Sequence, residues 1–276
     1  MTLSTAGEPS GTTDSVSGPW WLPQTVPLGH TLACRLGTLL LDVHHREGEW
    51  QLVTEQVEES AADARPEFVL HTGVPESGAG ERFMLSAGDR LVLAPLLADR
   101  PVVIRPRTPL FLLPGAETTM YLSTPLYLRV QVGEKAPTVL RELPMLRLSD
   151  TWFGPTTREG EICYAGKTHA RHSLDELPRR VHRAVTAVRI ANHAPNALPL
   201  ERLSLPVPML SIFGGADGRL WTQAVSLQRG SDSDMASLKI AEKPPSEAGD
   251  VSLITGPRQL PARGGVVRAF SLLFRE

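Results

Sequence analysis

The residues best able to do chemistry gather between positions 150 and 189. Residues 167–189 carry six basic side chains against two acidic ones, with three histidines among them. Arginine binds phosphate and carboxylate groups in bidentate geometry, and arginine and aromatic residues are enriched where proteins meet their partners. The region 150–183 therefore predicts a binding site for an anionic ligand or a partner protein. The candidate residues are Asp150, Trp152, Glu161, Tyr164, Lys167, Arg171, Arg179, Arg180, His182 and Arg183.

The same charges have a second interpretation, in which the segment is a solvated loop and short helix. Its arginines would then pair with the carboxylates of Asp150, Glu161 and Glu176. Charge concentration describes the field around a protein and does not by itself define a site. If Arg171 and His182 lie buried in ion pairs, the segment is a structural network instead.

Histidines of this segment offer a different chemistry. His169 and His172 are three positions apart and His182 follows, so three imidazoles are present for a zinc ion. A metal-dependent hydrolase that uses these three side chains is therefore the alternative function. No known ligand spacing is matched, so we expect surface or hydrogen-bonded histidines and no metal or other cofactor.

Motifs for other reaction classes are incomplete. Gly166, Lys167 and Thr168 resemble the end of a phosphate-binding loop, but five residues separate Gly160 from Gly166 where that motif needs four. Cys163 could pair with a nearby histidine, yet its large apolar neighbours predict a buried strand position. There is no Gly-x-Ser-x-Gly motif. The sequence thus leans away from an enzyme.

Overall charge and composition exclude several classes. The chain has 28 Lys and Arg against 30 Asp and Glu, so nothing attracts it to nucleic acid, and no row of aromatic residues accompanies the basic segment. No stretch approaches the ~20 apolar residues of a membrane helix, so no membrane insertion is expected. Residues 1–18 predict a disordered tail without a secretory signal. The expectation is a soluble cytoplasmic protein with Cys34 and Cys163 buried and reduced.

The elements that must position these residues are predicted to be β-strands. The 24 prolines exclude a helical bundle, and short apolar runs alternate with Pro and Gly turns. Residues 32–53 predict a hairpin with its tip near Gly48, and residues 126–132 a half-buried antiparallel strand. Ser173 and Glu176 form a capping box for one short helix near 173–177, which Pro178 ends.

The fold class is accordingly all-β, with two antiparallel β-sandwich-like modules. We predict them at residues 19–142 and 143–276, after the tail of residues 1–18, with one large sandwich as the alternative. In the second module, residues 185–192 and 198–205 flank a hairpin-like connection with a bulge near Leu200. A turn is predicted at residues 214–218, and a central strand at residues 266–274.

Several stretches carry a family resemblance. They are Leu148–Gly154, Gly160–Tyr164, Pro178–Ala184, Leu198–Leu203 and Glu247–Asp250. Through them the chain resembles the prokaryotic family of domains of unknown function numbered 432, over most of its length after the tail. The resemblance implies no catalytic residues. Proteins of this kind are associated with mechanosensitive channels, so the resemblance leaves a membrane protein open as a partner.

The sequence therefore favours a non-enzymatic binding or regulatory protein. It would use the region 150–183 to bind an anionic ligand or a partner protein. The metal-dependent hydrolase with histidines of segment 169–182 is the alternative, and a structural role in a large homo-oligomer is a third hypothesis.

Overall fold

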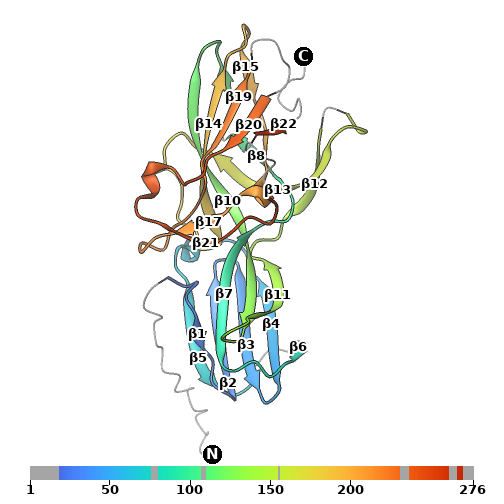
Figure 1. The fold of residues 1–276 in the computed structure, drawn as a ribbon, viewed down its shortest axis with the longest axis vertical. Helices are drawn as coiled ribbons and strands as arrows, with labels where there is room; N and C mark the ends of the chain where they lie inside the picture. Colours follow the sequence, from blue (N-terminus) through green and yellow to red (C-terminus); the bar gives the residue numbers. More distant parts are fainter. Residues whose placement is uncertain are drawn as a thin grey trace, which may run out of the picture.

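The computed structural model describes residues 19–75, 80–106, 110–154, 156–230, 236–260 and 266–269. The predicted all-β class is confirmed, because strands dominate the described residues and their helical segments are three short 3-10 turns. The strands build two bodies, one above the other along the long axis (Figure 1). We call them the lower body, which holds β1 to β7 and β11, and the upper body, which holds β8, β9 and β12 to β22; β10 runs through both.

Two sheets face each other in the lower body. One has the order β5-β2-β3-β4-β6, and β1, β7, the second half of β10 and β11 form the other. The bounds are β1 (Gln24–Thr25), β2 (His30–Leu36), β3 (Leu39–Arg46), β4 (Glu49–Gln56), β5 (Glu67–Thr72), β6 (Glu81–Met84), β7 (Arg90–Leu97), β10 (Glu117–Val132) and β11 (Thr138–Pro144).

The predicted hairpin at Gly48 is confirmed, since β3 and β4 pair from Arg46 and Glu49 outward. The sequence pattern missed a second hairpin one strand earlier, where β2 and β3 turn at Gly37 and Thr38. Gly37 has a φ of +68°, which a glycine adopts without the steric cost of a Cβ. The alternation of apolar and polar residues changes phase after Leu36 because the chain turns there.

The upper body is a mixed arrangement around β14. This strand pairs with β10 antiparallel and with β18 and β19 parallel, while a smaller sheet has the order β12-β13-β8-β16. The bounds are β8 (Val102–Pro106), β9 (Leu110–Leu112), β12 (Ser149–Phe153), β13 (Glu161–Ala170), β14 (Arg183–Asn192), β15 (Leu198–Leu200), β16 (Leu203–Leu205), β17 (Ile212–Gly214), β18 (Leu220–Thr222), β19 (Val225–Arg229), β20 (Ala236–Ile240), β21 (Ser252–Thr255) and β22 (Val266–Ala269).

Three local predictions need correction. Segment Ser173–Leu177 is a turn closed by Leu177 N–H donating to Leu174 O at 3.0 Å, because Pro178 follows before a helix can propagate. β14 and β15 do not form a hairpin, since β15 pairs with β9. The predicted bulge near Leu200 is instead a break between two strands of different sheets, because β16 pairs with β8.

Other predictions lie partly outside the described residues. The tail of residues 1–18 is not described, and of residues 266–274 only β22 is, which pairs with β20. The turn at residues 214–218 is confirmed between β17 and β18. No described helix is long and apolar enough to cross a membrane.

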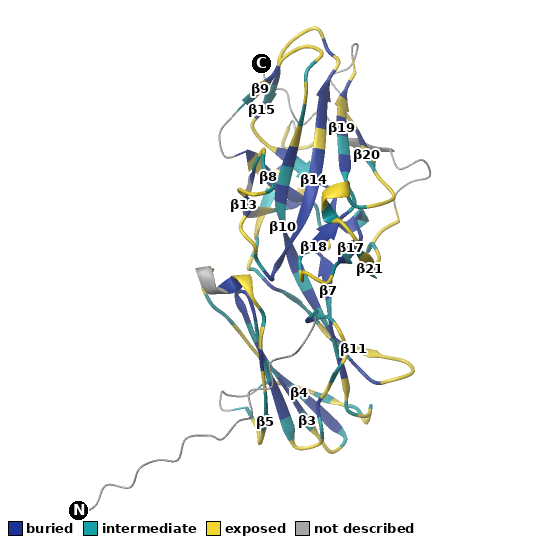
Figure 2. Cartoon of the chain, turned by 90° about the vertical axis from the view of Figure 1, so that its left-hand side faces the viewer, coloured by how far each residue is buried: buried dark blue, intermediate teal, exposed yellow. Residues whose placement is uncertain are grey.

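The strand β10 links the bodies. Its first half pairs with β14 and its second half with β7 and β11, so the predicted strand 126–132 is confirmed as part of a longer one that continues through Pro125. Buried residues run along the strands of both bodies (Figure 2), and one apolar cluster includes Leu36, Val43, Leu128 and Val188. Strand pairing is thus continuous between the two bodies through β10. The domain boundary between residues 142 and 143 stays a prediction.

A row of buried hydroxyls crosses this upper sheet and gives a first test. Thr186 Oγ1 on β14 lies 2.8 Å from Thr124 Oγ1 on β10 and 2.8 Å from Thr222 Oγ1 on β18, and all three residues are fully buried. Thr186→Val removes both contacts and leaves the buried Thr124 hydroxyl without its partner, while Thr222 keeps its bond to Gln223 O, so the variant costs about 2 kcal/mol. Thermal unfolding should show a Tm lower by roughly 4–8 °C, whereas Thr186→Ser, which keeps the hydroxyl, should lose less than half of that.

Candidate functional site

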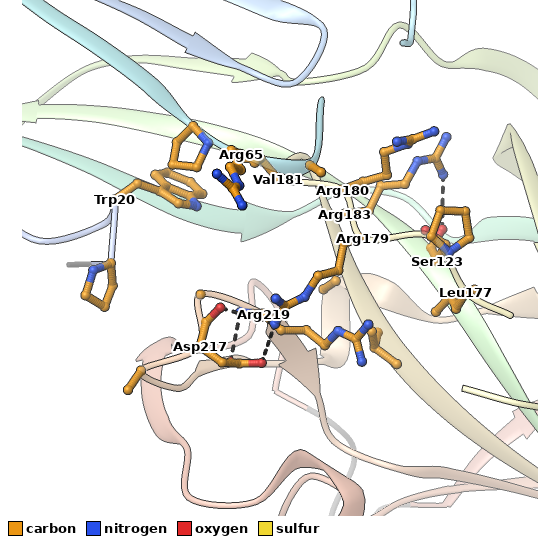
Figure 3. A pocket seen from close by; sticks show the side chains of 18 residues that line it. Trp20, Arg65, Ser123, Leu177, Arg179, Arg180, Val181, Arg183, Asp217 and Arg219 are labelled. Atoms are coloured by element: carbon orange, nitrogen blue, oxygen red, sulfur yellow. Dashed lines mark hydrogen bonds and ion pairs between the residues drawn. The ribbon is translucent and has the colours of Figure 1, made fainter. Parts of the chain in front are cut away.

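A pocket of about 510 Å³ lies where the two bodies meet. Five arginines line it, and Asp217 is the one carboxylate among the described lining residues. The arginines are Arg65, Arg179, Arg180, Arg183 and Arg219. Figure 3 shows Arg65 beside Trp20 on one side, with Arg179 and Arg219 near Asp217 on another. The volume is in the range of small-molecule sites, and the lining is strongly cationic.

Local structure explains how three of these arginines reach the pocket. Pro178 ends the turn at residues 174–177, and the extended residues that follow lead into β14, whose first residue is Arg183. Val181 N–H donates to Asp63 O at 2.9 Å, and Leu126 N–H donates to His182 O at 3.0 Å. These backbone bonds fasten the segment to Asp63 of the lower body and to β10 where that strand passes between the bodies, so its side chains are presented from a fixed strand start.

A single carboxylate from the lower body meets the basic segment. Glu59 Oε1 lies 2.9 Å from His182 Nε2, 3.0 Å from Arg183 Nε and 3.8 Å from Arg180 Nε. The hydrogen bond from His182, together with Arg183, lowers the pKa of Glu59 to about 2 although burial opposes this. We call these four residues the Glu59 cluster. It joins the two bodies by charge.

His182 and Arg183 are structural members of that cluster. His182 is fully buried and the Arg183 side chain is 5% exposed, and Arg183 Nη1 also donates to Ser123 O at 3.1 Å. A buried side chain whose polar atoms are already bound has little freedom to take a ligand. Among the predicted residues, Arg179 and Arg180 are therefore the more accessible to a bound molecule.

Asp217 organises the opposite wall. Arg179 Nη2 donates to Asp217 Oδ2 at 2.5 Å and to Asp217 O at 3.2 Å, and the backbone N–H of Arg219 donates to Oδ1 at 3.0 Å. The Arg219 side chain stacks over Trp221 at 5.9 Å, and burial together with Arg179 lowers its pKa. Its Nε is buried with no hydrogen-bond partner among the described residues.

The predicted residues of β12 and β13 lie on a different part of the upper body. Asp150 pairs with Arg100 at 3.1 Å, and the Tyr164 hydroxyl donates to Asp99 at 3.0 Å. Trp152 is 42% exposed and its Nε1 donates to Thr156 O. Burial raises the pKa of Glu161. None of these four lines the pocket, so the structure separates them from the arginines.

The remaining predicted residues are dispersed or not described. Arg171 Nη1 is 4.0 Å from Glu176, and His172 is exposed, with Nδ1 3.4 Å from Thr118 Oγ1. The side chains of Lys167 and His169 lie outside the described residues. No group of three His, Cys, Asp or Glu among the described side chains is placed to hold a metal, and His182 Nε2 is already beside Glu59.

The predicted burial of both cysteines is confirmed. Cys34 and Cys163 are free and buried. Burial raises the pKa of Cys163 to about 11, so its thiol is protonated at neutral pH and is a poor nucleophile.

Sequence reasoning missed most of the pocket lining. Trp20, Arg65, Asp217 and Arg219 come from three separate segments, and Glu59 comes from an acidic loop. The available signals were the two adjacent tryptophans near the start of the described residues and the Gly-rich turn before Arg219. Neither signal says that these segments face residues 177–185.

The described chain is an all-β protein whose two stacked bodies enclose an arginine-lined pocket. A family model covers residues 20–275, nearly the whole chain, and is described as "Protein of unknown function (DUF432)". The chain belongs to this family, and the resemblance seen in the sequence is confirmed. No curated protein and no solved structure matches it.

Proposed function

We propose that the protein is a non-enzymatic binding protein that takes an anionic ligand into the pocket between its two bodies. The observation that carries the proposal is the charge of the lining, with five arginines against one carboxylate. Guanidinium groups that converge on one space repel each other unless an anion joins them. A pocket of this size suits a small anion better than the surface of a partner protein.

The proposed binding site includes only the end of the predicted binding region 150–183, from residue 177 onward. Residues 177–181 and 183–185 line the pocket, whereas Asp150, Trp152, Glu161 and Tyr164 do not. We also propose that the protein works in the cytoplasm, where thiols stay reduced, and two buried free cysteines are compatible with that compartment.

Thermal unfolding with pyrophosphate as the probe tests the binding function. At about ten times its dissociation constant, a ligand stabilises the folded state by ~1.4 kcal/mol, which raises Tm by about 3–5 °C for a chain of this size. We expect a saturable rise of that size for the wild type, measured against sodium chloride at equal ionic strength. Arg179→Ala should lose most of it, because the Arg179 side chain is 49% exposed and lines the pocket.

Arg147→Ala is the matched control, since Arg147 is exposed and does not line the pocket. It should keep the full rise in Tm. An equal rise in wild type and Arg179→Ala would mean that the anion acts on the solvent or another surface, and the proposal would fail.

A further inference from the structure

The five arginines of the pocket differ in how their charge is compensated. Arg179 pairs with Asp217, and Arg180 and Arg183 pair with Glu59. Arg65 and Arg219 have no ion pair with any described residue. The pocket thus contains two guanidinium groups that form no ion pair with the described part of the chain, although Asp217 and Asp175 attract that of Arg219 from a greater distance.

These two arginines come from opposite bodies. Arg65 follows the 3-10 turn η1 (Ala61–Ala64), between β4 and β5 of the lower body. Arg219 directly precedes β18 of the upper body. Figure 3 shows the two side chains on different walls of the same space. A ligand that contacts both must therefore bridge the two bodies.

Arg219 is also short of a hydrogen-bond acceptor. Its Nε is buried with no partner among the described residues, and the nearby Asp217 carboxylate accepts from Arg179 and from the backbone N–H of Arg219. Buried donors in native proteins are nearly always satisfied, by protein, water or ligand. The acceptor that fits beside a guanidinium is an anionic oxygen.

Part of the remaining lining is apolar. Pro66 from the lower body and Leu177, Pro178 and Val181 from the upper body contribute hydrocarbon surface around the arginines. The volume of about 510 Å³ exceeds what one inorganic anion fills. A ligand that uses both kinds of surface has an anionic group and an organic part of modest size.

We propose that the ligand is a soluble organic phosphate whose phosphoryl group is bound by Arg65 from one body and Arg219 from the other. A phosphate monoester carries about −1.5 to −2 charges at pH 7, which matches two unpaired guanidiniums, whereas a carboxylate carries one. Its three terminal oxygens also let two arginines bind at once. This inference rests on the proposed anion-binding function and adds the ligand class and the bridging contact.

Calorimetric titration tests the ligand class with three probes: phenyl phosphate, benzoate and inorganic phosphate. Benzoate keeps the ring and replaces the phosphate, and inorganic phosphate keeps the anion without the ring. We expect phenyl phosphate to bind at least tenfold more tightly than either. Equal affinity for benzoate would overturn the phosphate assignment, and equal affinity for inorganic phosphate would overturn the organic part. In both cases anion binding itself would stand. No binding by any of the three probes or by pyrophosphate would defeat the proposed function as well.

Substitution tests the bridging contact. Arg65→Gln and Arg219→Gln should each weaken phenyl phosphate binding about 10- to 100-fold and reduce its advantage over benzoate, while Arg147→Gln changes neither. Arg65 is exposed, so its variant tests the contact even if Arg219→Gln, which loses the stacking on Trp221, folds poorly. Unchanged affinity in Arg65→Gln would overturn the bridge between the bodies.

Discussion

Glu59→Ala is expected to lower the free energy of unfolding by about 3 kcal/mol, and Tm by roughly 6–12 °C. The reason is that one carboxylate serves two buried partners, the fully buried His182 and the Arg183 guanidinium, which is 5% exposed. Removing one partner of a buried pair leaves the other charge uncompensated. We take the lower end of the usual cost, because the Glu59 side chain is 32% exposed and water can partly replace it. Urea or thermal unfolding measures the change.

Glu58→Ala is the matched control, because Glu58 is the exposed neighbour of Glu59 on the same loop. It should change Tm by no more than about 2 °C. A similar loss in both variants would mean that the loop, and not the Glu59 cluster, carries the effect.

Acid pH provides an independent check on the same contact. The pKa of Glu59 is about 2 in the folded protein, below its ordinary value of 4.5. A depressed pKa stabilises the folded state above pH 4.5, and that contribution disappears as the pH falls towards 2. The Tm difference between wild type and Glu59→Ala should therefore be constant from pH 7 to 5 and shrink below that. A difference that stays constant down to pH 2.5 would contradict the charge interaction.

Gly37→Ala is expected to destabilise the protein by about 3 kcal/mol or more. Gly37 has a φ of +68°, so a side chain there is strained by ~1–2 kcal/mol. The added Cβ would also lie 1.9 Å from Nδ1 of His182, which must move. Overpacking adds about 1–3 kcal/mol, and the moving imidazole leaves Glu59. Thermal unfolding followed by circular dichroism measures the sum.

Gly29→Ala separates the two causes. Gly29 has a φ of +78°, and nothing lies within 4 Å of its added Cβ, so only backbone strain remains. We expect Gly37→Ala to cost at least 1 kcal/mol more than Gly29→Ala. Equal costs would show that the space beside His182 adjusts freely and that the Glu59 cluster does not depend on it.

The fold class was predictable because it follows from local patterns. Each of these patterns predicts the backbone conformation of the residues that carry it: the alternation over residues 126–132, the turn at Gly48 and the Gly-rich turn at residues 214–218. The errors arose where a pattern depends on distant partners. Nothing local to residues 198–205 tells that β15 joins β9 while β16 joins β8. The turn at residues 173–177 has a helix cap, but Pro178 leaves no room for a helix.

The candidate site was predictable only in part. Residues 177–185 were visible as a basic segment, and all of them except His182 line the pocket. The β12 and β13 residues were grouped with them through closeness in sequence. They lie elsewhere, because β12 and β13 pair in the smaller sheet, and the chain passes through the rest of β13 and the turn at residues 174–177 before it reaches the pocket. Arg65, Arg219 and Glu59 approach that segment only through the stacking of the two bodies. The spacing of residues in the sequence does not predict how the two bodies stack, so the place of these three residues beside the basic segment could be seen only in the structure.

The most direct test of an anion site between the bodies is to locate a bound anion. Crystals grown without phosphate or sulfate and then soaked in tungstate, a heavy tetrahedral oxyanion, would give an anomalous signal at each bound ion. We predict the strongest peak inside the pocket, within hydrogen-bond distance of the Arg65 or Arg219 guanidinium. An empty pocket, with tungstate bound at other surfaces of the same crystal, would contradict the anion-binding function.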